Sequence, residues 1–429
     1  MPNAADAATE DAVRRAEILA GNAVDSLPAG ALADKLRLAD SEDRPLRVKL
    51  GIDPTAPDIH LGHAVVLGKL REFQDAGHRV VLIVGDYTAR VGDPSGRSSQ
   101  RPILSEQEID ENARTFQEQA SKILDSDPER LEVRRNSEWL DMPMADLLTL
   151  LGTTTAAQLL ERDDFAKRWA AREPISMLEL LYPLLQGYDS VAVRSDVEVG
   201  GTDQKFNLLL GRDVQRAYHQ PAQAILTMPI LVGTDGRMKV SKSLGNQIGI
   251  TDSPEDMYGK TMNIPDEAME EYRRLLLDAR SPGAGPGSGQ TAAGAGAAGG
   301  GGTGADEPSE LLPMDTKRAL ARELVTWLYS AEDAAAAERH FDRVHVEGGV
   351  PEQIEDAAFD SDGGRVHLPA VMAEQFGISR SQARRLIDEG GVSLGEAQLA
   401  AGEHDVPSER AEGQVLKVGK RRFRRLRGR

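Results

Sequence analysis

Two histidines near residue 60 stand at a spacing that suits nucleotide binding. His60 and His63 flank Gly62 in LGIDPTAPDIHLGH, just after an apolar run that ends near Gly51. If that run is a strand and a helix begins near His60, the free backbone N–H groups of the helix start favour phosphate. A spacing of three places both imidazoles on one face, and glycine lets a base or ribose approach the backbone. Alone, such a pair is usually ordinary helix surface; its place after Asp53-Pro54-Thr55 favours a binding site.

Two lysines form a second candidate group. Lys239 and Lys242 stand three residues apart in GTDGRMKVSKSLGN, a stretch rich in Gly, Ser and Asn with no apolar core of its own. A cationic loop of this kind can close over a leaving group that gains negative charge, such as pyrophosphate. A lone Lys-x-x-Lys loop is usually solvated surface. Together with the histidine segment it indicates chemistry on a nucleotide.

Strands alternating with helices must position these groups. Helical spacing recurs between apolar, β-branched runs, which predicts an α/β fold with a doubly wound parallel sheet over residues 40–250. The runs that predict strands are Arg47–Ile52, Arg79–Val84, Leu131–Arg134, Val191–Val193 and Ala224–Leu231. The segments that predict helices are His63–Ala76, Glu106–Leu124, Ser176–Gln186 and Lys205–Ala217.

The rest of the chain suggests further parts. Residues 1–39 are expected to be an N-terminal helical extension, and 251–346 a helical domain with helices at Pro254–Asn263, Asp266–Ala279 and Thr316–Tyr329. The Gly- and Ala-rich stretch 281–309 cannot bury enough apolar surface to offset the entropy of ordering, so we expect a flexible insertion. Residues 347–367 suggest a linker, and 368–429 a small terminal module with a basic tail.

Composition excludes several kinds of chemistry. The 429 residues contain no cysteine, which rules out disulfides, zinc ribbons, iron–sulfur clusters and thiol nucleophiles. We find no metal cluster in the sequence, no apolar stretch that could span a bilayer and no signal core, so we expect a cytoplasmic protein. The formal charge is −18, yet KVGKRRFRRLRGR at 417–429 is basic throughout. That asymmetry indicates a polyanion site; a disordered solubilising tail is the alternative.

These motifs, in this order, resemble those of class I aminoacyl-tRNA synthetases, and within them the bacterial tyrosyl-tRNA synthetase family. The resemblance extends to VGDYTARVGDPSGRSSQR at 84–101, LLYPLLQGYDS at 180–190 and VGGTDQKFNLLLGRD at 199–213. It covers nearly the whole chain except the N-terminal segment and the Gly/Ala insertion. It implies a Rossmann-like catalytic domain, a helical domain that meets the anticodon stem, and a small α+β S4-like RNA-binding domain.

The resemblance also implies a tyrosine pocket. Tyr182, Gln186 and Asp189 stand at i, i+4 and i+7, so they project from one helix face. In the family Asp189 meets the phenolic hydroxyl, while Tyr182 and Gln186 help to hold the α-ammonium. Read without the family, Tyr182 and Gln186 could be helix packing, and Asp93 could serve only a turn. The further tyrosine contacts that the resemblance implies are Gly51, Thr88, Asp93 and Gln204.

For the nucleotide, the resemblance implies an ATP site at the helix start and a grip on pyrophosphate at the lysine loop. The residues that match the ATP site are Asp53, Thr55, His60, Gly62, His63 and Asp203. Those that match the pyrophosphate contacts are Lys239, Lys242, Arg97 and Arg101. Of these sets, His60, His63, Thr55, Lys239 and Lys242 are the expected catalytic residues. RNA contacts are expected at Arg380, Arg384, Arg385, Arg421 and Arg422.

The implied reaction is tyrosine–tRNA ligation. ATP, accompanied by Mg²⁺, would activate L-tyrosine as an adenylate with release of pyrophosphate, and the tyrosyl group would pass to tRNA(Tyr) on a homodimer. One residue departs from the pattern. Many tyrosyl enzymes have a tyrosine two residues before the glycine of the G-x-D-P-T motif, as a second contact to the phenol, where this chain has Lys49. Asp189 is therefore expected to carry more of the hydroxyl recognition.

Three other functions compete with this one. A tryptophanyl enzyme has the same fold, but Asp189 with Gln186 and Gln204 favours a phenol over an indole. An RNA-binding protein on a retired synthetase scaffold would not need intact histidine and lysine motifs. A small nucleotidyltransferase shares the His-x-Gly-His chemistry but lacks the pocket helix and the RNA module.

Overall fold

The computed structural model describes residues 4–55, 58–94, 105–240, 245–278, 313–346, 354–361, 363–395, 397–419 and 422–428. The chain divides into two compact units, Met1–Leu328 and Tyr329–Arg429. The division falls within the stretch 251–346 that the sequence suggests as one helical domain. The expected Gly/Ala insertion, 281–309, lies outside the described residues.

A six-stranded sheet forms the centre of the first unit, in the order β1-β6-β5-β2-β3-β4. Every neighbouring pair is parallel except β1 and β6, which are antiparallel. The predicted doubly wound parallel sheet is confirmed, with an antiparallel edge strand that the sequence analysis missed in the N-terminal segment. The strands are β1 (Asp25–Leu27), β2 (Arg47–Ile52), β3 (Arg79–Val84), β4 (Leu131–Arg135), β5 (Val197–Gly201) and β6 (Ala224–Met228).

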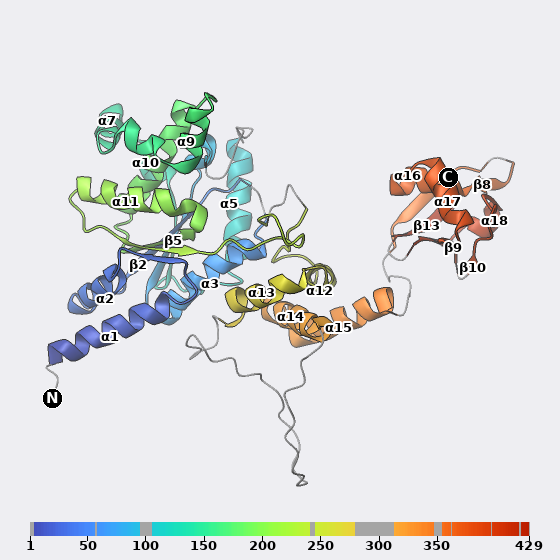
Figure 1. The fold of residues 1–429 in the computed structure, drawn as a ribbon, viewed down its shortest axis with the longest axis horizontal. Helices are drawn as coiled ribbons and strands as arrows, with labels where there is room; N and C mark the ends of the chain where they lie inside the picture. The colour runs from blue at the N-terminus through green and yellow to red at the C-terminus, as the bar shows by residue number, and fades with distance from the viewer. Residues whose placement is uncertain are drawn as a thin grey trace, which may run out of the picture. The chain divides into compact units, whose positions relative to one another are not determined.

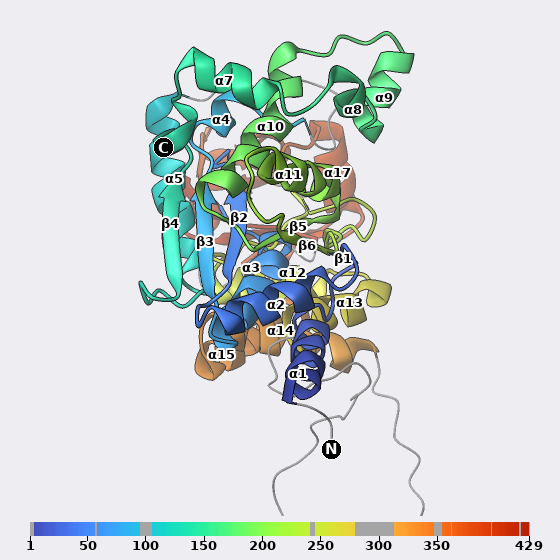
Figure 2. The ribbon, with the colours of Figure 1, turned by 90° about the vertical axis from the view of Figure 1, so that its left-hand side faces the viewer.

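Helices cover both faces of this sheet. In Figures 1 and 2, α10 and α11 lie on one face of the sheet and α3 on the other. This arrangement buries the strands on both faces, which is why β3 reads as the continuous apolar run RVVLIV. The helices before α10, the helix that carries Tyr182, Gln186 and Asp189, are α1 (Ala4–Leu19), α2 (Ala31–Ser41), α3 (Leu61–Asp75), α4 (Thr88–Val91), α5 (Glu106–Ala120), α6 (Ser137–Leu140), α7 (Met144–Leu151), α8 (Ala156–Leu160) and α9 (Asp163–Ala170). Those that follow are α10 (Met177–Ala192), α11 (Lys205–Ala217), α12 (Pro254–Met262), α13 (Met269–Leu276) and α14 (Pro313–Leu328).

One predicted strand is wrong. Val191–Val193 was expected to be extended because it is β-branched, but it forms the last turn and the C-cap of α10. The helix continues through these residues, and the side chains of Val191 and Val193 are buried. Arg194 ends the helix with a φ of 50°. The strand comes next, as β5.

The strand order reverses between β2 and β5, which is where a ligand crevice is expected in a doubly wound sheet. From β2, the chain goes outward through β3 and β4 on one side, then returns to β5 and β6 on the other. In open α/β sheets, ligands bind outside the carboxyl ends of the strands at such a reversal. Asp53 follows β2 there, and Asp203 follows β5, in the 3-10 turn Thr202–Gln204.

The second unit has its own apolar core. A five-stranded sheet, β10-β9-β12-β13-β7, and the pair β11-β8 pack with helices around residues such as Leu368, Met372 and Leu416. The segment 347–367, expected to be a linker, contributes β7 and β8. The strands are β7 (Asp356–Phe359), β8 (Arg365–His367), β9 (Val392–Leu394), β10 (Ala397–Gln398), β11 (Asp405–Pro407), β12 (Val415–Val418) and β13 (Arg422–Gly428). The helices are α15 (Ala331–Phe341), α16 (Leu368–Phe376), α17 (Arg380–Asp388) and α18 (Ser408–Ala411), with a π-helical turn at Asp342–Val346.

Residues 422–428 of the basic tail form strand β13, which pairs with β12 on one side and β7 on the other. Phe423 and Leu426 are buried, while Arg424 and Arg427 are not. The strand therefore presents arginines outward from a packed module, at variance with a disordered tail.

No described helix is both apolar enough and long enough to cross a bilayer. In the same part of the chain, no group of three or more His, Cys, Asp and Glu side chains is placed to hold a metal ion.

Candidate active site

His60 forms the N-cap of α3, and its ring stacks on that of His63. The ring centroids are 3.9 Å apart, and the backbone N–H of His60 donates to Nδ1 of His63 at 3.3 Å. Because Nδ1 of His63 accepts, its proton sits on Nε2. A Cβ on Gly62 would meet the His60 ring at 3.0 Å, so the glycine gives this imidazole its room.

Both imidazoles are neutral at ordinary pH. Burial lowers the pKa of His60 to about 3, helped by His63 and Lys239, and burial lowers that of His63 to about 4. Within the described residues, the buried Nδ1 of His60 has no hydrogen-bond partner. A buried polar atom left unpaired costs free energy. The atom is therefore a candidate for a ligand contact.

The lysine loop meets this helix start, although nearly 180 residues separate them in sequence. The N–H of Leu61 donates to the carbonyl oxygen of Ile248 at 2.9 Å, and Val240 lies 3.6 Å from where a Cβ on Gly62 would be. Lys239 Nζ lies 3.5 Å from Oδ2 of Asp203. The two motifs that the sequence singled out separately thus form one site with the end of β5. Lys242, Arg97 and Arg101 lie outside the described residues.

The expected tyrosine-binding side chains of α10 are buried on one face. The Tyr182 hydroxyl donates to Oδ2 of Asp53 at 2.9 Å, and Thr88 donates to the other oxygen of that carboxylate at 2.6 Å. Asp53 was expected at the ATP site. It links the α10 face to the segment that leads into α3: Thr55, two residues further on, donates its N–H to the Asp53 carbonyl oxygen at 2.7 Å. Gly51 leaves open space, with no atom within 4 Å of an added Cβ.

Two carboxyl groups at this site have raised pKa values. Burial raises the pKa of Asp53 to about 7, although the hydrogen bonds from Thr88 and Tyr182 act to lower it. Burial also raises the pKa of Asp189 to about 6, while Lys49 pulls it down. The pKa of Tyr182 is raised well above its ordinary value by burial and by the neighbouring carboxylates. Such a group of buried acids is suited to a cationic ligand group.

A chain of amides joins the remaining tyrosine-site candidates. Gln204 donates from Nε2 to Oδ2 of Asp93 at 2.9 Å, so Asp93 does more than serve a turn. Asn207 donates to the side-chain oxygens of Gln204 at 3.0 Å and of Gln186 at 2.9 Å. Buried Arg162 donates to Asn207 at 3.2 Å. Asn207 and Arg162 were not among the site residues predicted from the sequence. Asn207 lies one helical turn from Gln204, which was an available signal.

Asp189 has two partners that the sequence analysis also missed. The indole N–H of Trp139 donates to Oδ1 at 2.8 Å, and Nδ2 of Asn136 lies 3.5 Å from Oδ2. Asn136 also donates to Thr88 at 2.9 Å. Both follow the carboxyl end of β4. Polar side chains at the carboxyl ends of parallel strands are expected near ligands, so their position was a usable signal.

The expected RNA contacts lie on the second unit. Arg380, Arg384 and Arg385 are exposed on α17, and Arg385 lies 3.8 Å from Glu389. Arg422 begins β13, with its guanidinium 5.9 Å from the ring centroid of Phe376. Arg421 lies outside the described residues.

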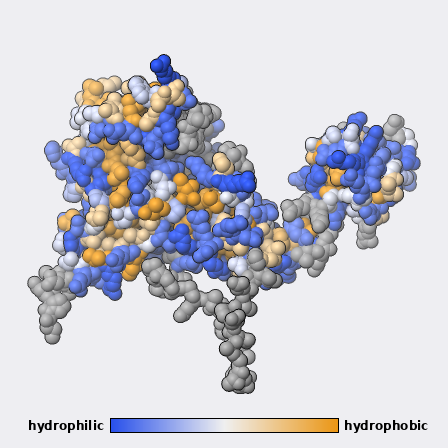
Figure 3. Space-filling model, viewed as in Figure 1, coloured by the Kyte–Doolittle hydropathy of each residue, from blue (hydrophilic) through white to orange (hydrophobic). Residues whose placement is uncertain are grey.

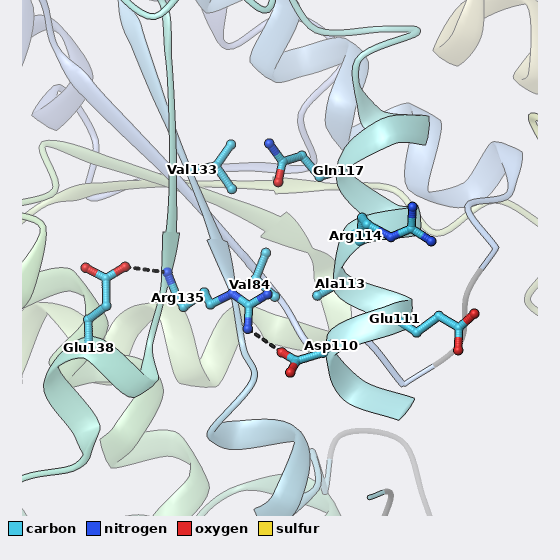
Figure 4. A pocket seen from close by; sticks show the side chains of 9 residues that line it. All are labelled: Val84, Asp110, Glu111, Ala113, Arg114, Gln117, Val133, Arg135 and Glu138. Atoms are coloured by element: carbon cyan, nitrogen blue, oxygen red, sulfur yellow. Dashed lines mark hydrogen bonds and ion pairs between the residues drawn. The ribbon is translucent and has the colours of Figure 1, made fainter. Parts of the chain in front are cut away.

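A cavity of about 790 Å³ lies away from these residues, between α5 and the ends of β3 and β4 (Figure 4). Within its lining, the Arg135 side chain contacts Asp110, and the backbone N–H of Arg135 donates to Glu138 at 2.9 Å. None of the expected site residues lines it. We therefore locate the candidate active site at the β2–β5 crevice, where the chemistry-bearing side chains converge.

The fold and the crevice together define a class I aminoacyl-tRNA synthetase. The model of the family "tRNA synthetases class I (W and Y)" matches residues 41–281. The chain is 47% identical over 420 residues to the tyrosine–tRNA ligase of Moorella thermoacetica, covering 97% of this chain and 96% of that protein. It is 45% identical over 413 residues to the tyrosine–tRNA ligase of Thermotoga maritima, covering 96% and 97%. The chain belongs to the bacterial tyrosyl-tRNA synthetase family.

Solved structures share the fold. The tyrosyl-tRNA synthetase of Archaeoglobus fulgidus, solved in complex with L-tyrosine, is 24% identical and superimposes with a TM-score of 0.57. The match covers 76% of this chain and 99% of that one. A similar enzyme from Aeropyrum pernix gives a TM-score of 0.56 at 20% identity, covering 77% and 97%.

Proposed function

We propose that this protein is a tyrosine–tRNA ligase. It activates L-tyrosine with ATP and then transfers the tyrosyl group to the 3′ end of tRNA(Tyr). The observation that carries the proposal is the hydrogen bond from Tyr182 to Asp53 at 2.9 Å. It joins the α10 face, with its buried Asp189, to the segment that leads into His60. An amino-acid pocket and a nucleotide site then share one carboxylate.

Tyrosine would lie with its phenolic hydroxyl toward Asp189 and its α-ammonium among Tyr182, Gln186 and Asp93. A carboxylate accepts the hydroxyl proton in a hydrogen bond, and the raised pKa values of Asp53 and Asp189 reflect a buried negative site that an ammonium would relieve. Thr88, Gln204 and Gly51 complete the pocket in this proposal. An indole offers a single N–H donor and no acceptor, which makes tryptophan the weaker fit.

In the first step the tyrosine carboxylate attacks the α-phosphorus of ATP. One P–O bond forms, the bond to the β-phosphate oxygen breaks, and pyrophosphate leaves with the electron pair. No general base is needed, because the nucleophile is already ionised. Catalysis then consists of positioning and of stabilising charge on the leaving group. His60, His63, Thr55 and Gly62 would serve the ATP phosphates, and Asp203 the ribose.

The departing pyrophosphate would be gripped by cations. Lys239 pairs with Asp203, the proposed ribose contact, and so lies beside the nucleotide site. Lys242, Arg97 and Arg101 are proposed to bind the pyrophosphate together with it. ATP would bring Mg²⁺ bound to its own phosphates. We propose no tightly bound cofactor.

Transfer to tRNA would use the C-terminal part of the chain. We propose a catalytic domain at 40–250 preceded by the extension 1–39, a helical domain at 251–346, a junction at 347–367 and an S4-like domain at 368–429. In that domain, exposed Arg380, Arg384 and Arg385, together with Arg421 and Arg422, would contact phosphates. The protein would work in the cytoplasm.

We further propose a homodimer. Exposed large apolar side chains lie on α7, α9 and the start of α10, and Figure 3 shows apolar surface at the upper end of the first unit, where α7 lies. They are Met144, Leu148, Trp169, Met177 and Leu178. A face of this kind suits a self-complementary interface. Sedimentation of Leu148→Asp should show monomer where the unaltered protein shows dimer.

ATP–pyrophosphate exchange tests the function directly. Purified protein should form labelled ATP from labelled pyrophosphate with tyrosine, and far less with tryptophan or phenylalanine. Exchange with tryptophan alone would indicate the tryptophanyl activity. If no amino acid supports exchange, the RNA-binding and nucleotidyltransferase alternatives remain. Charging of tRNA(Tyr), with a steep loss of activity as salt rises, tests the second step.

A further inference from the structure

Lys49 is a cation that lies wholly inside the first unit, next to the proposed pocket. It stands on β2 and pairs in register with Glu198 on β5; the two side chains are 0% and 2% exposed. Nζ lies 2.9 Å from Oε1 of Glu198, and it donates to Ser190 Oγ at 2.8 Å and to the carbonyl oxygen of Gln186 at 3.0 Å. An ammonium group has three hydrogens. These three acceptors use all of them.

Lys49 therefore has no hydrogen left for a substrate phenol. Two of its three acceptors, Gln186 and Ser190, belong to α10, the helix that carries Asp189. The third belongs to the neighbouring strand. The lysine thus ties the pocket helix to the two strands that flank the crevice.

Glu198 extends the same connection. Its carboxylate accepts from Nε2 of Gln186 at 3.4 Å and from the Ser190 hydroxyl at 3.2 Å, and Gln223 donates to it as well. The other end of the Gln186 amide accepts from Asn207 at 2.9 Å. Both ends of that amide are therefore held, which fixes how it faces the pocket.

We infer that Lys49 and Glu198 are positioning residues for tyrosine recognition. The buried pair holds α10 so that Asp189 meets the phenolic hydroxyl and Gln186 the ammonium end. The inference rests on the proposed function. Stability does not by itself account for such a pair, because apolar residues of similar volume are often as stable or more so in a protein interior. This pair makes four hydrogen bonds with α10, two from Lys49 and two to Glu198, which apolar residues would not provide.

The charge of Lys49 also acts on Asp189. Burial is the main influence on that carboxyl, and Lys49 is the cation that opposes it. The other charged or titratable groups facing it are Glu198 from β5, Asp53 after β2, and Tyr182 on its own helix. Trp139 and Asn136 face it from the segment after β4 and are uncharged.

The double variant Lys49→Met/Glu198→Gln tests the inference, because it removes both charges and leaves neither buried alone. KM for tyrosine should rise about tenfold in ATP–pyrophosphate exchange, as expected when one charged hydrogen bond is misplaced, while KM for ATP stays within about twofold. As KM for tyrosine rises, the preference for tyrosine over phenylalanine should fall. Ser190→Ala removes one acceptor without changing any charge, and should raise KM for tyrosine by about threefold.

Lys69→Met is the matched control. Lys69 is 1% exposed on α3 and bonds to Glu72 and to the carbonyl oxygen of Gly21, away from α10. The Lys69→Met substitution should lower the melting temperature and leave KM for tyrosine unchanged. An unaltered KM for tyrosine in the folded pocket variants, or an equal rise in both KM values, overturns the inference. Failure of the unaltered protein to exchange with tyrosine counts instead against the proposed function.

Discussion

The indole N–H of Trp139 donates to Oδ1 of Asp189 at 2.8 Å, and this bond joins the segment after β4 to the pocket helix across 50 residues of sequence. It fixes the carboxylate that we propose to meet the phenol. Because a buried carboxylate with few donors tends to take up a proton, the indole also helps Asp189 to stay an acceptor.

Trp139→Phe should therefore weaken tyrosine binding. The ring still fills the space, but the donor is lost, and a hydrogen bond to a charged group contributes about 1.5–3 kcal/mol. We expect KM for tyrosine to rise about tenfold or more in pyrophosphate exchange, with KM for ATP little changed. Trp327→Phe is the control, since Trp327 lies on α14 and belongs to none of the proposed sites. An equal effect of both substitutions would argue against the role of the indole.

Tyrosine affinity should increase with pH. The pKa of Asp53 is about 7 and that of Asp189 about 6, both raised by burial. When protonated, Asp53 attracts the ammonium weakly and Asp189 accepts the phenolic hydrogen less well, so the dissociation constant for tyrosine should fall as pH rises from about 5 to about 8. Calorimetric titration at several pH values measures this. Asp53→Asn should remove the part of the change near pH 7, whereas a flat profile in the unaltered protein would contradict the assignment.

The same shift predicts how stability varies with pH. A carboxyl with a raised pKa binds its proton more tightly in the folded state than in the unfolded chain. Its contribution is therefore favourable in acid and is lost as pH rises from 3.8 towards about 7. In urea denaturation without substrate, Asp53→Asn should gain stability relative to the unaltered protein on going from pH 5 to pH 8. A relative loss over that range would show that the carboxylate is stabilised in the fold.

Gly62→Ala should disturb the nucleotide site. The new Cβ would meet Cε1 and Nδ1 of His60 at 3.0 Å, so the imidazole must turn. Since small misplacements of catalytic groups are costly, we expect kcat for activation to fall about tenfold or more. Gly68→Ala on the same helix has no atom within 4 Å and should stabilise the protein by about 0.4–1 kcal/mol. Stopped-flow activation and thermal melting of both variants distinguish local crowding from a general helix effect.

Lys239→Ala should slow activation without weakening tyrosine binding. Its ammonium pairs with Asp203 at 3.5 Å in the ligand-free site and would pass to the pyrophosphate as charge develops there. Loss of one such donor typically costs about 10²-fold in kcat. Lys260→Ala is the comparison, because Lys260 is also partly exposed and paired with an aspartate, Asp252, at 2.7 Å. Parallel losses in kcat and tyrosine affinity would rule out a role confined to the leaving group.

Much of the catalytic unit could be predicted from local patterns. β2, β3 and α11 begin and end where their apolar runs and helical spacing indicate. The i, i+4, i+7 set on α10 needed only the helix period to bring its side chains to one face. These features depend on residues only a few positions apart, so periodicity in the sequence predicts them.

What the sequence did not indicate depends on long-range pairing. The partner of Lys49 on β5 is set by the register of two parallel strands whose connection spans well over 100 residues, and no local pattern specifies that register. The Trp139–Asp189 hydrogen bond also joins residues far apart in sequence, so no local pattern predicts it. Val191–Val193 shows the opposite failure, since a local β-branched signal yielded to the helix that contains it. β1, at Asp25–Leu27, is too short to carry a pattern.

That short strand has a practical consequence. β1 lies antiparallel along β6, and Asp25 anchors it through Thr227 at 2.6 Å and Lys205 at 2.7 Å. Without it, the N–H and C=O groups along one side of β6 would lose their partners. An uncovered strand edge recruits strands from other molecules. Shortened versions that begin after residue 30 are therefore expected to aggregate by sheet extension, even though every proposed catalytic side chain would still be present.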